Sequence, residues 1–158
     1  MKLFFRPIIN HDFYMEIPES FDFMTDDIAR IKYPSELRPH VIFTNEDASV
    51  DYKFSYVNQT LDEGLLDELI KQTKLNLRKI YTGIQFYDKD IFQVDGTKLG
   101  WFEFMSPAID GSLYNIVFYT WINGQLLQGG FNCIYEDSVS WRPIVINSLR
   151  TIRKETVI

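Results

Sequence analysis

The residue best suited to chemistry in this sequence is Cys133, the only cysteine among 158 residues. A catalytic thiolate needs a neighbouring base, and the only two histidines, His11 and His40, lie far from it in the sequence and outside any recognisable catalytic motif. One cysteine and two scattered histidines also lack the ligand spacing of a zinc site, such as C-x-x-C or H-E-x-x-H. We therefore expect a packed thiol, with no catalytic residue, no metal ligand and no cofactor.

Carboxylates offer a second route to catalysis. Asp88 and Asp90 share one face of a predicted strand, and Glu103 is expected near them across a hairpin. Paired acids can divide the roles of acid and base, but such residues more often keep an exposed strand face soluble. The glycines form neither a dinucleotide-binding motif nor a phosphate-binding loop. A small-molecule binding protein or weak hydrolase with a carboxylate-lined pocket is kept as an alternative.

Composition favours one ordered domain, residues 1–158, because 46% of the residues are hydrophobic and 24% are charged. The formal net charge of −6 opposes binding to a phosphate backbone. The clearest basic cluster, Arg150, Arg153 and Lys154, falls at the end of a predicted helix, where the helix dipole favours cations. No nucleic-acid partner is expected.

The N-terminal segment "MKLFFRPIIN" briefly resembles a signal peptide, but Arg6 and Pro7 interrupt its apolar run. No stretch approaches the length needed to span a bilayer, so we expect no membrane insertion. A lone cysteine is compatible with a reducing compartment. The expected location is therefore the cytoplasm, and a bacterial source is expected.

The elements that must position these residues are mostly strands. Hydrophobic residues alternate from 84 to 135, and the alternation is interrupted at Asp95-Gly96, Asp110-Gly111 and Asn123-Gly124. These dipeptides tolerate the positive φ angles of tight hairpins, so the segment predicts a four-stranded antiparallel meander. Shorter strands are expected in "HDFYMEIPESFDF", where Pro18 ends the strand, and at 41–43 and 50–57.

Three helices are predicted between and after the strands. A short helix is expected to begin after Thr25, which acts as its N-cap. The longest is expected to begin with a capping box formed by Thr60 and Glu63 and to end at Gly83. The last is expected to begin at Ser140, with a proline in its first turn, where the missing N–H costs nothing. The pattern belongs to the α+β class.

A two-residue turn at Asn123-Gly124 places Ile122 opposite Gln125 and so fixes which side chains share a face. One face is almost wholly apolar, and we expect it to be a dry core that contains Cys133. Burial there raises the pKa of a thiol. The members of this face are Ile122, Thr120, Phe118, Ile116, Tyr114, Leu127, Gly129, Phe131 and Cys133.

The opposite face mixes large rings with amides, as amphipathic contact surfaces do. Its candidate protein-binding residues are Asn115, Tyr119, Trp121 and Gln128. The alternative is that the last helix covers this face. Gly129-Gly130 permits a bulge or the close approach of another backbone, and the alternative is that it only relieves crowding next to Trp121.

The order of these elements resembles the PsbP-like superfamily, which includes Ran-binding Mog proteins, photosystem PsbP, DcrB-type proteins and Eag-type chaperones. The resemblance runs from about Phe13 to the end and rests on "IPESF", "GWFEF", "DGSLYNIVFYTWINGQLLQGGFNCIYED" and "SLRTIRK". The individual residues that carry it are Gly111, Tyr114, Gly124, Phe131, Cys133 and Trp141.

This resemblance implies an α/β/α sandwich around a twisted antiparallel sheet, with two main helices. It also implies action through binding other proteins. Together with the missing catalytic residues, this favours a non-catalytic binding, adaptor or chaperone-like protein whose partner is another protein. A homodimer that pairs through an edge strand is kept as a further alternative.

Overall fold

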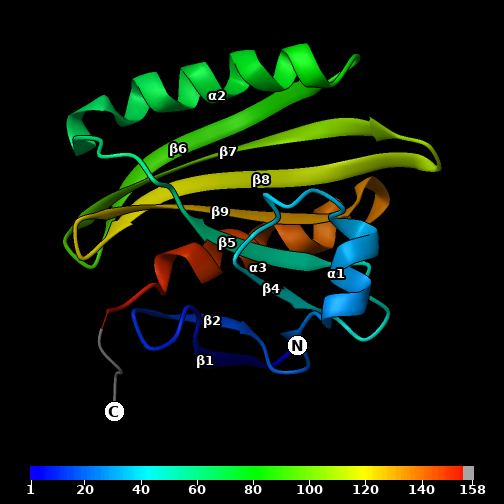
Figure 1. Ribbon diagram of the computed structural model, residues 1–158, viewed down its shortest axis with the longest axis horizontal. Coiled ribbons are helices and arrows are strands. Elements are labelled where there is room, and N and C mark those ends of the chain that lie inside the picture. Colours follow the sequence, from blue (N-terminus) through cyan, green and yellow to red (C-terminus); the bar gives the residue numbers. More distant parts are fainter. Residues whose placement is uncertain (155–158) are drawn as a thin grey trace.

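A seven-stranded antiparallel sheet forms the centre of the computed structural model, which describes residues 1–154 (Figure 1). Its strand order is β3-β4-β5-β9-β8-β7-β6, and β1 and β2 pair separately as a hairpin. The strands are β1 (Leu3–Pro7), β2 (Tyr14–Pro18), β3 (Asp22–Phe23), β4 (Val41–Thr44), β5 (Asp51–Tyr56), β6 (Gln85–Val94), β7 (Thr97–Ala108), β8 (Gly111–Ile122) and β9 (Gln125–Ile134). The helices are α1 (Asp26–Lys32), α2 (Leu66–Ile80) and α3 (Ser138–Arg150), with single 3₁₀ turns η1 (Glu63–Leu65) and η2 (Tyr135–Asp137).

The predicted meander is confirmed: β6 to β9 follow one another in the sheet with short reversals between them. At two of the turns the residue before glycine takes a left-handed conformation, Asp95 with a φ of 49° and Asn123 with a φ of 50°. Ile122 pairs with Gln125, as the two-residue turn requires. The register, and therefore the assignment of side chains to the two faces, is the one predicted from sequence.

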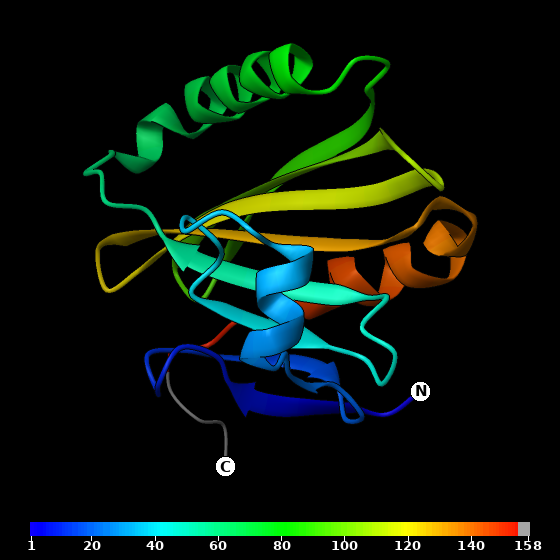
Figure 2. The same cartoon turned by 45° about the vertical axis from the view of Figure 1, so that its right-hand side comes forward.

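Two helices cover opposite faces of the sheet, so the architecture is a three-layer α+β sandwich (Figures 1 and 2). α3 and the β1–β2 hairpin pack on the face that carries Cys133, with Met15 and Leu149 in the shared core. α2 packs on the other face through Leu66 and Ile70. The short α1 lies beside β4 and β5 and adds a small cluster centred on Ala29.

The start of α2 differs from the prediction. The helix begins at Leu66, after η1, and the side chain of Asp62 accepts a hydrogen bond from the backbone N–H of Gly64 at 2.7 Å. The carboxylate of Glu63 instead accepts from the N–H of Lys98 in β7 at 2.9 Å. The predicted capping box of Thr60 and Glu63 is therefore wrong, because Asp62 caps the turn and Glu63 is held by the sheet.

The start of α3 also differs. The helix begins at Ser138, directly after η2, so Ser140 is not its N-cap and Pro143 lies in its second turn. A proline there leaves the carbonyl of Val139 without a helical donor. Val139 is exposed, so water can hydrogen-bond to that carbonyl. By contrast, Thr25 caps α1 as predicted and accepts from the N–H of Ile28.

Candidate functional site

Cys133 lies in the core between the sheet and α3, with none of its surface exposed. It pairs with Tyr114 across β8 and β9. Burial, assisted by the nearby negative charge of Asp137, raises the pKa of the thiol to about 12. A protonated, inaccessible thiol cannot act as a nucleophile, so the prediction of a packed cysteine is confirmed.

The predicted carboxylate group is only partly assembled. Glu103 is buried and accepts hydrogen bonds from the Tyr114 hydroxyl at 2.5 Å, Arg142 Nε at 2.8 Å and the N–H of Asp88 at 3.1 Å. Arg142 also approaches Asp88 at 3.4 Å. Asp90 stays outside this group and accepts from the N–H of the next residue.

The Glu103 cluster therefore serves to attach α3 to the sheet. Burial, followed by the hydrogen bond to Glu103, raises the pKa of Tyr114. The hydrogen bond to Glu103 likewise raises the pKa of Arg142. Both oxygens of Glu103 accept hydrogen bonds from protein donors: Oε1 from Tyr114 and Arg142, and Oε2 from the N–H of Asp88. Among residues 1–154, no group of three potential metal ligands is found, either here or elsewhere.

The predicted contact surface is divided by α2. Tyr119 and Trp121 are 4% and 5% exposed, because α2 and the segment before it lie over them. The Tyr119 hydroxyl lies 2.9 Å from Thr73 Oγ1, and Trp121 Nε1 donates to the carbonyl of Leu61 at 2.9 Å. These two rings are therefore covered in the structure and do not form the open surface that the sequence predicted. The covering helix is α2, whereas the last helix lies on the other face.

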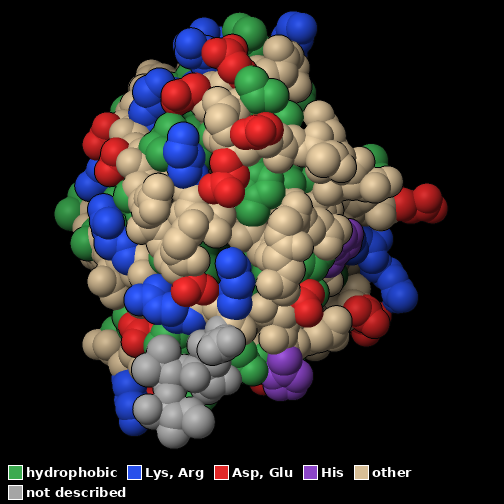
Figure 3. Space-filling view, turned by 90° about the vertical axis from the view of Figure 1, so that its left-hand side faces the viewer, with side chains coloured by type: hydrophobic (Ala, Val, Ile, Leu, Met, Phe, Trp, Pro, Cys, Tyr) green, Lys and Arg blue, Asp and Glu red, His purple; other side chains and the backbone are tan. Residues whose placement is uncertain are grey.

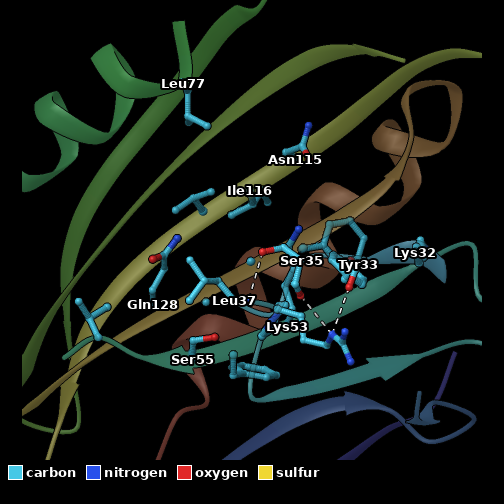
Figure 4. Close-up of a pocket in the computed structure, with 18 of the residues that line it drawn as sticks. Lys32, Tyr33, Ser35, Leu37, Lys53, Ser55, Leu77, Asn115, Ile116 and Gln128 are labelled. Carbon is cyan, nitrogen blue, oxygen red and sulfur yellow. Dashed lines mark hydrogen bonds between the residues drawn. The ribbon is translucent and has the colours of Figure 1, made fainter. Parts of the chain in front are cut away.

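Of the remaining two predicted residues, Gln128 is exposed on the part of this face that α2 leaves open. Asn115 is only 9% exposed, and its amide donates to Ser106 Oγ at 2.9 Å. Both line a pocket of about 800 Å³ between α2 and the segment that follows α1 (Figure 4). Side chains of β5, β8 and β9 form its floor, with Ser55 beside Gln128. Leu77 of α2 stands on one side, and Leu37 of the loop stands on the other.

Buried Asp51 holds the loop side of this pocket in place. Its carboxylate is fully buried in β5 and accepts from Lys32 Nζ at 2.7 Å, the Tyr33 hydroxyl at 2.7 Å and Thr44 Oγ1 at 2.8 Å. Burial, together with the negative charge of Asp51, raises the pKa of Tyr33. Arg38 Nε donates to the carbonyls of Tyr33 and Ser35, at 3.1 Å and 3.3 Å, which fixes the loop further.

The charges that line the pocket are all positive. Lys32, Arg38 and Lys53 contribute to its wall and floor, and no aspartate or glutamate among residues 1–154 does. Lys53 Nζ lies 5.3 Å from the centre of the Tyr33 ring. Burial lowers the pKa of Lys53, and the positive charge of Lys32 lowers it further, while Asp51 opposes both.

The lining contains hydroxyls, amides, cations and apolar side chains, but no cysteine and no histidine. Among the described residues of the lining there is therefore neither a cysteine–histidine or serine–histidine pair nor an acid–base pair of carboxylates. The pocket has the features of a binding site: a concave surface, apolar walls and a few polar groups. On the side of the molecule at the left of Figure 1, acidic, basic and hydrophobic side chains are interspersed (Figure 3).

Sequence reasoning missed Lys53 and the loop 33–39. A signal was present in "DYKFSYV", where Asp51, Lys53 and Ser55 alternate with aromatic residues and so put polar groups on one strand face. Leu37, in the otherwise polar segment "PSELRP", was a second signal. Neither shows that the two segments meet, because that contact depends on how α1 packs beside β5.

No protein-family model matches the sequence, and no curated protein matches it. Solved structures do match. The cyanobacterial PsbP (CyanoP) of Synechocystis sp. PCC 6803 superposes with a TM-score of 0.68 at 10% identity, covering 96% of this chain and 91% of that one. The chain has the PsbP-like fold.

Two further structures share this PsbP-like fold. The Ran-binding protein Mog1p of Saccharomyces cerevisiae has a TM-score of 0.58 at 10% identity, covering 97% of this chain and 95% of that one. LpqN of Mycobacterium tuberculosis, involved in cell envelope biogenesis, has a TM-score of 0.59 at 8% identity, covering 89% and 81%. The expected fold is confirmed. No helix in the described part of the chain has the length and apolarity required to traverse a membrane.

Proposed function

We propose that this chain is a non-catalytic binding protein that holds a segment of another protein in the pocket between α2 and the segment that follows α1. The observation that carries this proposal is the open part of the sheet face, where Gln128 and Ser55 lie between apolar walls. The PsbP-like fold supports it, because Mog1p, which shares the fold, is a Ran-binding protein. An adaptor or chaperone role requires a site of this kind.

Side chains, not strand pairing, must recognise the partner. The strands under the pocket, β5, β9 and β8, are internal to the sheet, so their backbone groups are already paired. The edge strand β6 is also poorly suited to pair with a strand of a partner. A bulge between Phe86 and Lys89 and the charges of Asp88 and Asp90 oppose the addition of another strand there. These features also argue against a homodimer through this edge.

Site-specific photo-crosslinking in the source cell tests the proposal. A benzophenone amino acid replaces Gln128 on the pocket floor or, as the control, Val139 at the exposed start of α3. We expect the probe at Gln128 to capture a defined protein and the probe at Val139 not to capture it. Leu37→Glu, at a side chain that is 94% exposed, should abolish the capture, and the matched Val139→Glu should not. Equal capture from both positions contradicts the proposal.

A small-molecule ligand is the second candidate, because a volume of about 800 Å³ falls within the range of ligand pockets. Native mass spectrometry of the purified protein distinguishes the two. A stoichiometric bound molecule that is lost in Leu37→Glu favours the small molecule, and the bare mass favours the protein segment.

A further inference from the structure

The pocket concentrates positive charge on a protein whose formal net charge is −6. Three cationic side chains line it, and no acidic side chain from the described part of the chain does. Lys32 is neutralised by Asp51 at 2.7 Å. Within residues 1–154, no ion pair joins Lys53 or Arg38 to a carboxylate, so two positive charges remain available at the pocket.

The side chain of Lys53 lies over Gly130 at the pocket floor. Lys53 pairs with Gly130 across β5 and β9, and its side chain crosses the space that a side chain at 130 would fill: an added Cβ would meet Lys53 Cε at 2.9 Å. Its ammonium group lies near the Tyr33 ring at 5.3 Å.

Apolar groups flank this cation. Leu37 projects from the loop with 94% of its surface exposed, and Leu77 of α2 lies across the pocket from it (Figure 4). Tyr81, directly after α2, also lines the pocket. Gln128, between the two leucines, has no side-chain hydrogen-bond partner among residues 1–154. An occupant that matches these groups carries a negative charge next to apolar side chains.

Resting on the proposed function, we infer that the bound partner segment is both acidic and apolar: a carboxylate reaches Lys53 while an apolar side chain lies between Leu37 and Leu77. The amide of Gln128 hydrogen-bonds to the backbone of the segment. A carboxylate at Lys53 also compensates for burial of the ammonium group, which otherwise lowers the pKa of Lys53. A basic segment is repelled by the same charges, so the pocket selects by charge sign.

Fluorescence anisotropy with three short blocked peptides tests this inference. In them leucine alternates with glutamate, with glutamine or with lysine. We expect the glutamate peptide to bind about tenfold more tightly than the glutamine peptide, as one charge-assisted hydrogen bond predicts, and the lysine peptide not to bind. Lys53→Met should remove the preference and Lys53→Arg should keep it, while Lys98→Met, at an exposed lysine of β7, should leave it unchanged. Thermal unfolding of each variant confirms that it is folded.

Three results overturn the inference: equal affinities for the three peptides, a preference that survives in Lys53→Met, or binding of decanoate with no binding of the glutamate peptide. Binding of decanoate alone would mean that the pocket binds a small, negatively charged amphiphile and not a peptide. The crosslinking experiment separates this failure from failure of the proposed function. If the probe at Gln128 captures a protein whose crosslinked segment is neutral or basic, the protein-binding function stands and only the acidic character of the segment is wrong.

Discussion

The ring of Phe118 occupies the place where a side chain at Gly129 would begin. The two residues pair directly across β8 and β9, and a Cβ added at position 129 would lie 2.0 Å from Phe118 Cζ and 2.1 Å from Cε1. Phe118 is in turn packed edge-on against Phe54 with ring centres 6.2 Å apart. The glycine thus lets an aromatic ring lie flat on the sheet in the main core.

We expect Gly129→Ala to destabilise the fold by about 3 kcal/mol, because the buried ring cannot move without disturbing its neighbours. Gly130→Ala is the matched control. Its added Cβ would meet the flexible end of Lys53 at 2.9 Å, which can shift at small cost. Urea denaturation of both variants measures the difference. Equal losses of unfolding free energy would show that Phe118 does not require the glycine.

Asp51 should stabilise the pocket loop, residues 33–39, more than the rest of the fold. Asp51→Ala leaves Lys32, Tyr33 and Thr44 without their common acceptor, and we expect a loss of about 3 kcal/mol in the free energy of unfolding. Hydrogen exchange should show the greatest loss of protection in residues 33–39. Asp27→Ala, which removes an exposed ion pair with Arg30, should cost little. Uniform loss of protection would contradict a local role for Asp51.

The meander was predictable because the information is local. The turns at Asp95-Gly96 and Asn123-Gly124 are each specified by two adjacent residues, and the alternation that follows assigns the side chains of β8 and β9 to the two faces. Once Asn123-Gly124 fixed the register, the burial of Cys133 followed from counting along two strands. The β1–β2 hairpin lacked such a signal, because its strands are joined by a longer segment without a turn dipeptide.

The choice of helix for each face was not predictable from these patterns. Both α2 and α3 carry apolar residues at helical spacing, so either could cover Trp121. The contact that decides it, the hydrogen bond from Trp121 to the carbonyl of Leu61, joins residues sixty positions apart. The pocket has the same origin, since it forms where the loop after α1, strand β5 and the end of α2 meet.

Cys133 should react slowly in the folded protein. With a pKa of about 12, its thiolate fraction at pH 8 is lower than that of an ordinary cysteine by about a thousandfold, and burial restricts access further. Alkylation by iodoacetamide at pH 8 should therefore be slower by at least that factor than in concentrated urea. Mass spectrometry at timed intervals measures both rates. Fast alkylation of the folded protein would place the thiol outside the core.

The raised pKa also makes this cysteine sensitive to alkali. Folding favours the protonated thiol, so its contribution to stability is complete below the ordinary thiol pKa and is lost as the pH rises through about 12. We expect the melting temperature to fall between pH 9 and pH 11, about where ordinary thiols ionise, and to fall less steeply in Cys133→Ala. Differential scanning calorimetry across this range measures the slopes. Parallel slopes would mean that other groups account for the whole alkaline loss.

The two residues of the Glu103–Arg142 ion pair should contribute unequally to the free energy of unfolding. The Glu103 side chain is 6% exposed and receives three donors, whereas Arg142 is 41% exposed and can be replaced by water. Glu103→Gln places an amide N–H₂ against these donors, and we expect a loss of about 3 kcal/mol. Arg142→Met keeps the bonds from Tyr114 and from the N–H of Asp88, so about 1 kcal/mol is expected.

Urea denaturation of the two variants and of the double variant measures this asymmetry. If Glu103 is the centre of the cluster, the double variant should be scarcely less stable than Glu103→Gln alone, because Arg142 has no comparable acceptor left. Additive losses would show that Arg142 stabilises α3 independently, for example through its position over the Trp101 ring at 5.8 Å. A loss in Arg142→Met equal to that in Glu103→Gln would instead show that the exposed cation carries the attachment of α3 to the sheet.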